Sequence, residues 1–246
     1  MSALRIERDG PVLRVALAKP ERRNAFDAAL IGELHEAFSD VGDAGAVLLA
    51  GDGPSFSAGA DVEWQRSAID LSYEENVEDA LRLYRMLEAI DTCPAPVVGR
   101  IQGYALGGGS GVAACLDVGI AATDAVFGFS EVKLGIIPAV ISPFVLPRIG
   151  AAARRYFLTG ERFDASTALQ IGLVSEVTGD LDGAVERVVG ELLTSGPEAA
   201  REAKRLIRDR PRGAEAAQTA ARLRTGQEGQ EGLRAFLERR KPAWMD

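Results

Sequence analysis

Histidine and cysteine are nearly absent from this chain of 246 residues, which has one histidine and two cysteines. A lone His35 argues against a Ser–His–Asp or Cys–His nucleophile and excludes a histidine-rich zinc site. Two cysteines do not make a disulfide framework. His35 falls on the polar side of a segment with helical spacing and is expected at the surface. Cys115 lies among alanine, valine and leucine and is expected to be a buried, inert thiol, because apolar burial raises a thiol pKa.

The chain also lacks long apolar runs and an excess of basic residues. No apolar run reaches the roughly 18 residues that span a bilayer, since the longest, residues 134–146, is broken by Pro138 and Pro143. The N-terminus shows no secretory signal, so a cytoplasmic protein without a membrane partner is expected. A net charge of −8 and a pI of about 4.9 argue against a nucleic-acid partner.

Apolar runs that alternate with helical patterns predict an α/β fold. Hydrophobic residues make up 47% and charged residues 26%, as in ordinary globular proteins. The expected elements are a hairpin of residues 4–8 and 12–17, a helix at 28–38, and strands at 47–50, 96–101, 118–122 and 126–129. From residue 196 onward, alanine, arginine and glutamate with helical spacing dominate. We therefore predict a core of residues 1–195 and a C-terminal helical region of residues 196–246.

Two glycine-rich segments are the most informative feature of the chain. They are FSAGAD at residues 56–61 and GYALGGGSG at residues 103–111. Each follows an apolar run that is typical of a buried strand, and each leads into a helix-like stretch. Small residues at such junctions leave backbone N–H groups uncovered. Two facing junctions can aim one N–H each at a single carbonyl oxygen, which is the arrangement of an oxyanion hole.

These segments resemble the crotonase (enoyl-CoA hydratase/isomerase) superfamily. RRNA at residues 22–25, SEVKLGIIP at 130–138 and GLV at 172–174 match the same family in the same order. Residues 130–143 are most similar to the bacterial branch of methylglutaconyl-CoA and carboxygeranoyl-CoA hydratases. The resemblance implies a spiral of ββα units, a C-terminal helical oligomerisation region and a homotrimer or dimer of trimers. It also implies an acyl-CoA thioester substrate in fatty acid metabolism, with coenzyme A as part of the substrate and no separate cofactor or metal.

The resemblance also assigns site residues. The oxyanion-hole donors it implies are the N–H groups of Ala58 and Gly108, and the proton-transfer group is Glu131. The apolar strand before Glu131 supports this role, because a carboxylate in apolar surroundings has a raised pKa. The implied substrate and coenzyme A contacts are Arg23, Ala25, Ser57, Ala60, Asp61 and Gly109, and the basic residues 239–241 are a further candidate for the phosphates.

Gly111 departs from the family pattern, because the two-glutamate hydratases carry glutamate there. Three functions stay open: hydration of a 2-enoyl-CoA, branched or carboxylated; Δ3,Δ2-enoyl-CoA isomerisation by Glu131 alone; and weakly catalytic acyl-CoA binding. A second carboxylate would come from the substrate or from Glu63, Asp70 or Glu74. Glutamate at position 111 is expected to raise hydration. A dinucleotide-binding fingerprint at residues 109–114 is disfavoured, because it leaves residues 56–61 without a role.

Overall fold

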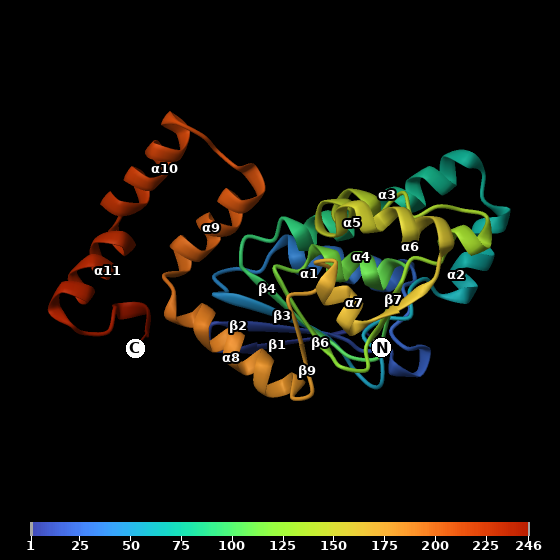
Figure 1. The fold of residues 1–246 in the computed structure, drawn as a ribbon, viewed down its shortest axis with the longest axis horizontal. Coiled ribbons are helices and arrows are strands. Elements are labelled where there is room, and N and C mark those ends of the chain that lie inside the picture. Colours follow the sequence, from blue (N-terminus) through green and yellow to red (C-terminus); the bar gives the residue numbers. More distant parts are fainter. Residues whose placement is uncertain (1, 246) are drawn as a thin grey trace.

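A six-stranded sheet in the order β1-β2-β3-β4-β6-β9 forms the centre of the computed structural model, which describes residues 2–245 (Figure 1). Strands β1 (Leu4–Asp9) and β2 (Val12–Leu17) pair antiparallel, which confirms the predicted hairpin. The remaining neighbours are parallel: β3 (Ala46–Gly51), β4 (Val97–Ile101), β6 (Val118–Ala122) and β9 (Glu176–Thr178). The mostly apolar sequences of β3, β4 and β6 fit a parallel sheet that is covered on both faces.

Helices cover both faces of this sheet. Helix α8 (Leu181–Thr194) packs on one face, where Leu48, Val98 and Ile120 join the side chains of the helix in one apolar cluster (Figure 1). The opposite face carries α1 (Ala28–Ser39), α3 (Tyr73–Asp91) and α4 (Gly108–Cys115) over a larger core. Because successive strand residues point to opposite faces, adjacent residues of β3 serve two different cores.

A three-stranded sheet of β5 (Tyr104–Leu106), β7 (Val126–Gly128) and β8 (Arg162–Asp164) brings the two glycine segments together. An isolated parallel bridge pairs Ser57 with Ala105, and a second one pairs Phe26 with Ala60. The first segment therefore lies along β5, at the point where the second segment turns into α4. The facing arrangement that the sequence predicted is confirmed.

Shorter elements complete the core. Helix α2 (Val62–Ser67) and the 3-10 helix η2 (Ala68–Asp70) lead into α3 at one end of the molecule (Figure 1). The 3-10 helix η3 (Glu131–Leu134) follows β7. The rest are η1 (Pro20–Arg22), α5 (Ser142–Ile149), η4 (Gly150–Ala152), α6 (Ala153–Thr159), α7 (Ala165–Gln170) and η5 (Ala243–Met245).

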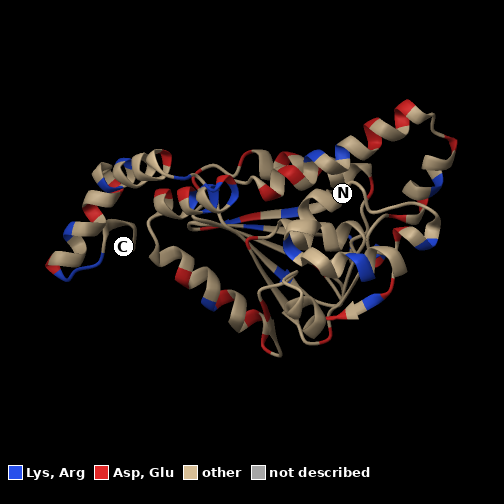
Figure 2. Cartoon of the chain, turned by 45° about the horizontal axis from the view of Figure 1, so that its top comes forward, with Lys and Arg blue, Asp and Glu red and all other residues tan. Residues whose placement is uncertain are grey.

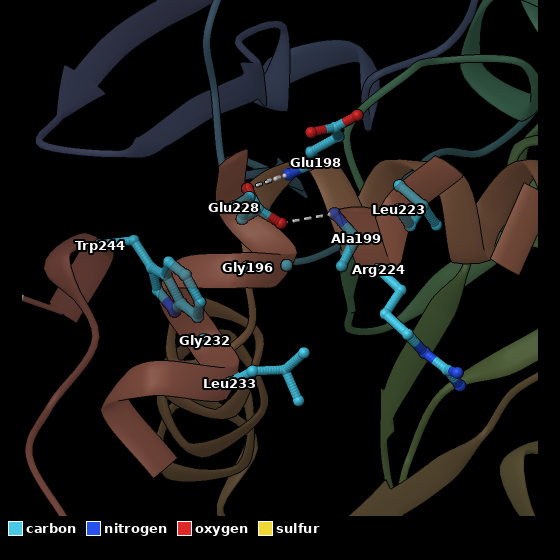
Figure 3. Close-up of a pocket in the computed structure, with 10 residues that line it drawn as sticks. Gly196, Glu198, Ala199, Leu223, Arg224, Glu228, Gly232, Leu233 and Trp244 are labelled. Carbon is cyan, nitrogen blue, oxygen red and sulfur yellow. Dashed lines mark hydrogen bonds between the residues drawn. The ribbon is translucent and has the colours of Figure 1, made fainter. Parts of the chain in front are cut away.

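The C-terminal region is helical, as predicted, and extends from the core at the end opposite α2 and α3 (Figure 1). It consists of α9 (Pro197–Asp209), α10 (Ala214–Thr225) and α11 (Gln227–Glu238). Glu228 accepts hydrogen bonds of 2.8 Å from the N–H groups of both Glu198 and Ala199, and so caps α9 from α11 (Figure 3). Trp244 packs against Gly232 and donates its indole N–H to the carbonyl oxygen of Thr194 at 3.1 Å. Hydrogen bonds therefore hold the helices of this C-terminal arm, residues 196–245, to one another and to the end of α8. The domain boundary at residue 195 stays a prediction.

The surface features agree with the composition. Acidic and basic residues are interspersed along the chain (Figure 2). Helix α3 carries Glu74 and Glu75 in its first turn. His35 is exposed and Cys115 is buried, both as predicted, and burial raises the pKa of the Cys115 thiol. Across residues 2–245, none of the helices combines the length and the apolar character that a bilayer crossing requires.

Candidate active site

A cavity of about 410 Å³ opens between the two glycine segments, η3 and the helices α2 and α3. A second cavity, of about 370 Å³, lies among the C-terminal helices (Figure 3). Its two acidic residues already have partners: Glu228 accepts from two backbone N–H groups of α9, and Glu198 pairs with Arg222 at 3.4 Å. The first cavity has unsatisfied polar groups and is the candidate active site.

The first glycine segment is held rigidly by Ser57. Its N–H donates to the Tyr104 carbonyl at 2.8 Å, and its hydroxyl donates to the Asn24 carbonyl at 2.8 Å. Gly59 has φ +90°, and a Cβ there would stand 2.7 Å from the carbonyl oxygen of Leu106, so glycine is required. The side chain of Ser57 is fully buried within the loop, so its predicted ligand contact stays a prediction.

The N–H groups of this segment are not equivalent. Ala58 lines the cavity, but its N–H donates to the Arg23 carbonyl at 2.9 Å. The structure therefore does not support Ala58 as a free donor. Ala60 also lines the cavity, and its N–H has no acceptor among the described residues. The N–H without an acceptor within residues 2–245 therefore belongs to Ala60, two residues further along the same loop.

The second glycine segment presents the N-terminus of α4 to the cavity. Gly107 has φ +50°, and its N–H donates to the Gly128 carbonyl at 2.9 Å. The first helical hydrogen bond runs from the Gly111 N–H to the Gly107 carbonyl at 3.0 Å. The N–H of Gly108 is therefore left without an acceptor among residues 2–245, as the first N–H groups of a helix are. Gly108 lines the cavity together with Gly107.

Glu131 opens η3, directly after β7, and its carboxyl group lies against Gly107. A Cβ on Gly107 would stand 3.4 Å from Oε1 of Glu131. The other oxygen, Oε2, is buried without a hydrogen-bond partner among the described residues. Burial raises the pKa of this carboxyl above 4.5. A buried carboxyl oxygen without a partner is rare, and at a cavity wall it suits proton transfer.

The other predicted contact residues lie around the cavity rather than in its wall. Arg23 adopts φ +52° and stacks its guanidinium 5.7 Å from the centre of the Tyr104 ring. Asp61 caps α2 through the N–H of Glu63 at 2.8 Å and pairs with Arg22 at 3.0 Å, which holds the pKa of its carboxyl low against the opposing effect of burial. Ala25 and Gly109 are buried. The structure thus gives these residues structural roles near the cavity.

Gly111 is packed so closely that no side chain fits there without rearrangement. An ideal Cβ on Gly111 would stand 2.6 Å from Cγ2 of Ile141 and 3.7 Å from Cδ2 of Leu87. Ile141 is itself buried and lines the cavity. The space that a glutamate at position 111 would occupy is therefore filled by Ile141. This corrects the expectation that Gly111→Glu alone would raise hydration.

Among the cavity-wall residues that sequence reasoning missed are Trp64, Asp79, Leu83 and Arg162. Asp79 Oδ1 accepts a hydrogen bond of 3.3 Å from the indole Nε1 of Trp64. Arg162 is exposed, lies 5.5 Å from the centre of the Tyr104 ring, and forms no ion pair among the described residues. Helical spacing groups Asp79 with Leu83 on one face of α3, and this spacing is the signal that could have found it. Glu63, Asp70 and Glu74, which the sequence offered as second carboxylates, are not part of the wall.

The chain as a whole is similar to known proteins. Residues 7–246 match the family model for enoyl-CoA hydratase/isomerase. A crotonyl-CoA hydratase of Syntrophomonas wolfei is 32% identical over 251 residues, covering 96% of this chain and 95% of the relative. The crystal structure of an enoyl-CoA hydratase from Shewanella pealeana is 39% identical with a TM-score of 0.94, covering 98% of this chain and 96% of that one. AtuE of Pseudomonas aeruginosa is 37% identical with a TM-score of 0.95, covering 99% and 100% of the two chains.

Proposed function

The chain belongs to the enoyl-CoA hydratase/isomerase family, and from this premise we propose that it adds water to the double bond of a 2-enoyl-CoA. The observation that carries the proposal is the buried Oε2 of Glu131, which has no hydrogen-bond partner within residues 2–245. It lies in the same cavity as two backbone N–H groups that are likewise unpaired within that range. An enolate formed at the thioester carbonyl needs two such donors, and a proton must reach the neighbouring carbon. The cavity offers groups for both needs.

In this proposal the thioester oxygen accepts hydrogen bonds from the N–H groups of Ala60 and Gly108. Each donor of an oxyanion hole is worth about 2.7–4 kcal/mol in the transition state. Glu131, whose carboxyl pKa is raised by burial, gives its proton to the α-carbon as the enolate collapses. The hydratase names of the relatives support water addition as the overall reaction.

Isomerisation is the second candidate, because Gly111 carries no carboxylate and one glutamate suffices to move a proton between two carbons. A carboxylated acyl group is a finer possibility for either reaction. It is favoured by Arg162, a cation in the cavity wall that no carboxylate of residues 2–245 pairs with. The guanidinium of Arg162 could equally pair with a phosphate of coenzyme A. The substrates tested must therefore include uncharged acyl groups, which carry the phosphates but no carboxylate.

The test is turnover of a panel of straight, branched and carboxylated 2-enoyl-CoA and 3-enoyl-CoA thioesters. Hydration consumes the conjugated thioester absorbance, whereas isomerisation of a 3-enoyl-CoA creates it. We expect hydration in the parent and a loss of about 10²–10⁴-fold in Glu131→Gln, with coenzyme A affinity retained. A parent that only isomerises, or a variant that keeps most of its kcat, would contradict the proposal.

A further inference from the structure

We propose that Asp79 is the second carboxylate of the active site and activates the water that adds to the double bond. This inference rests on the hydratase function proposed above. Asp79 and Glu131 are the two carboxylates in the cavity wall, and most of the residues around them are apolar. Hydration needs a base for water as well as an acid for the α-carbon, so the cavity contains one group for each role.

Helix α4 cannot supply that base. The position on α4 that lies one turn beyond Gly108 is Gly111, and its Cβ site is closed by Ile141 at 2.6 Å. The base therefore has to come from another element that reaches the cavity. Helix α3 is the one with a carboxylate in the wall.

The face of α3 toward the cavity is a row of residues four apart: Asp79, Leu83 and Leu87. Leu87 reaches the Cβ site of Gly111 at 3.7 Å, and Leu83 lines the cavity. At 1.5 Å per residue the row spans about 12 Å. It runs along the cavity from Leu87, beside α4, to Asp79, beside α2. Asp79 is half-buried at the α2 end of this row.

A single hydrogen bond orients the carboxylate of Asp79 and leaves its second oxygen without a donor among the described residues. Its Oδ1 accepts the indole N–H of Trp64 at 3.3 Å. Its Oδ2 accepts no hydrogen bond from the described residues, and the carboxylate forms no ion pair with them. The neighbouring Glu78 differs, since it pairs with Arg85 at 2.9 Å outside the cavity. Asp79 therefore has one oxygen fixed by the protein and one open to a water molecule.

The proposed step balances without a further reactant. Asp79 takes one proton from water while the water oxygen bonds to the β-carbon. The π electrons of the double bond move to form the enolate, whose oxygen is held by the N–H groups of Ala60 and Gly108. As the enolate collapses, Glu131 gives its proton to the α-carbon. Exchange with solvent then returns a proton to Glu131 and removes one from Asp79.

The decisive variant is Asp79→Asn, which keeps an oxygen for the Trp64 hydrogen bond and removes the base. We expect hydration to fall by about 10²–10⁴-fold. Exchange of the α-protons of a saturated acyl-CoA in D₂O needs only Glu131 and the oxyanion hole, so it should stay within severalfold of the parent. Glu131→Gln should lose both activities. Glu78→Gln, on the same helix but outside the cavity, should retain both.

Two further variants separate a catalytic role from a structural one. Asp79→Glu should recover part of the lost hydration. Trp64→Phe removes the indole hydrogen bond and leaves the carboxylate of Asp79 in place, so it should cost less than Asp79→Asn. Asp79→Asn that hydrates like the parent, or that loses hydration and exchange equally, would overturn the proposal. A parent without hydration would instead refute the proposed function itself.

Discussion

The contact between Gly111 and Ile141 gives a quantitative test of how the cavity is built. Replacing a helix-interior glycine with alanine ordinarily stabilises a protein by up to about 1 kcal/mol. At Gly111 the new Cβ would stand 2.6 Å from Cγ2 of Ile141, closer than side-chain carbons approach one another. Such overpacking costs about 1–3 kcal/mol. Gly111→Ala is therefore expected to lower the free energy of unfolding by about 1 kcal/mol, against the ordinary direction.

A double-mutant cycle isolates this contact. Ile141→Ala alone should cost about 2–5 kcal/mol, because it opens a cavity at a buried site. In the double variant the methyl group at 111 no longer meets Cγ2, so the closest contact is removed and only the 3.0 Å contact with Cβ of residue 141 remains. We expect a coupling energy of about 1–3 kcal/mol that favours the double variant.

The assay is urea unfolding of the purified proteins, followed by circular dichroism. Gly32→Ala is the matched control, since Gly32 lies inside α1 and a Cβ there meets nothing within 4 Å. The control should be neutral or stabilised. Single variants whose effects add within about 0.5 kcal/mol would refute the argument that Ile141 fills the position. Gly111→Glu, with a longer side chain, should lower both stability and hydration unless Ile141 is shortened as well.

The remaining predictions concern pH, the first loop and the C-terminal arm. Because burial raises the pKa of Glu131 above 4.5, the folded state holds its proton longer than the unfolded state. The free energy of unfolding should fall as the pH rises from 4.5 through the raised pKa, and Glu131→Gln should remove this contribution. The same pH dependence of the free energy of unfolding in parent and variant would contradict the prediction. Gly59→Ala forces φ +90° on alanine and a Cβ within 2.7 Å of the Leu106 carbonyl, so thermal unfolding should show a loss of about 1–3 kcal/mol. Phe236 is 81% exposed beside Leu237 on α11, so Phe236→Glu should lower the molecular mass measured by light scattering if these side chains pack on another subunit; an unchanged mass would show that they do not.

The amino-acid sequence by itself determined the elements and the general location of the site. The apolar runs of β3, β4 and β6 and the hairpin at Gly10 follow from local pattern, and so does the turn into α4 at Gly107. The apolar strand before Glu131 also predicts the raised pKa of its carboxyl, which burial in the folded chain produces. Glycine at the two loop junctions marked the places where backbone N–H groups would be uncovered.

Only the tertiary structure decided which of those groups are free. The N–H of Ala58 is taken by the Arg23 carbonyl from another segment, and no local pattern reveals that partner. In the same way, Ile141 closes the space beside Gly111 although it lies 30 residues further along the chain. Trp64 on α2 orients Asp79 on α3 through a hydrogen bond between the two helices. Local sequence fixes backbone conformation through short-range sterics, whereas hydrogen-bond partners and free volume depend on residues that are distant in sequence and meet only in the folded chain.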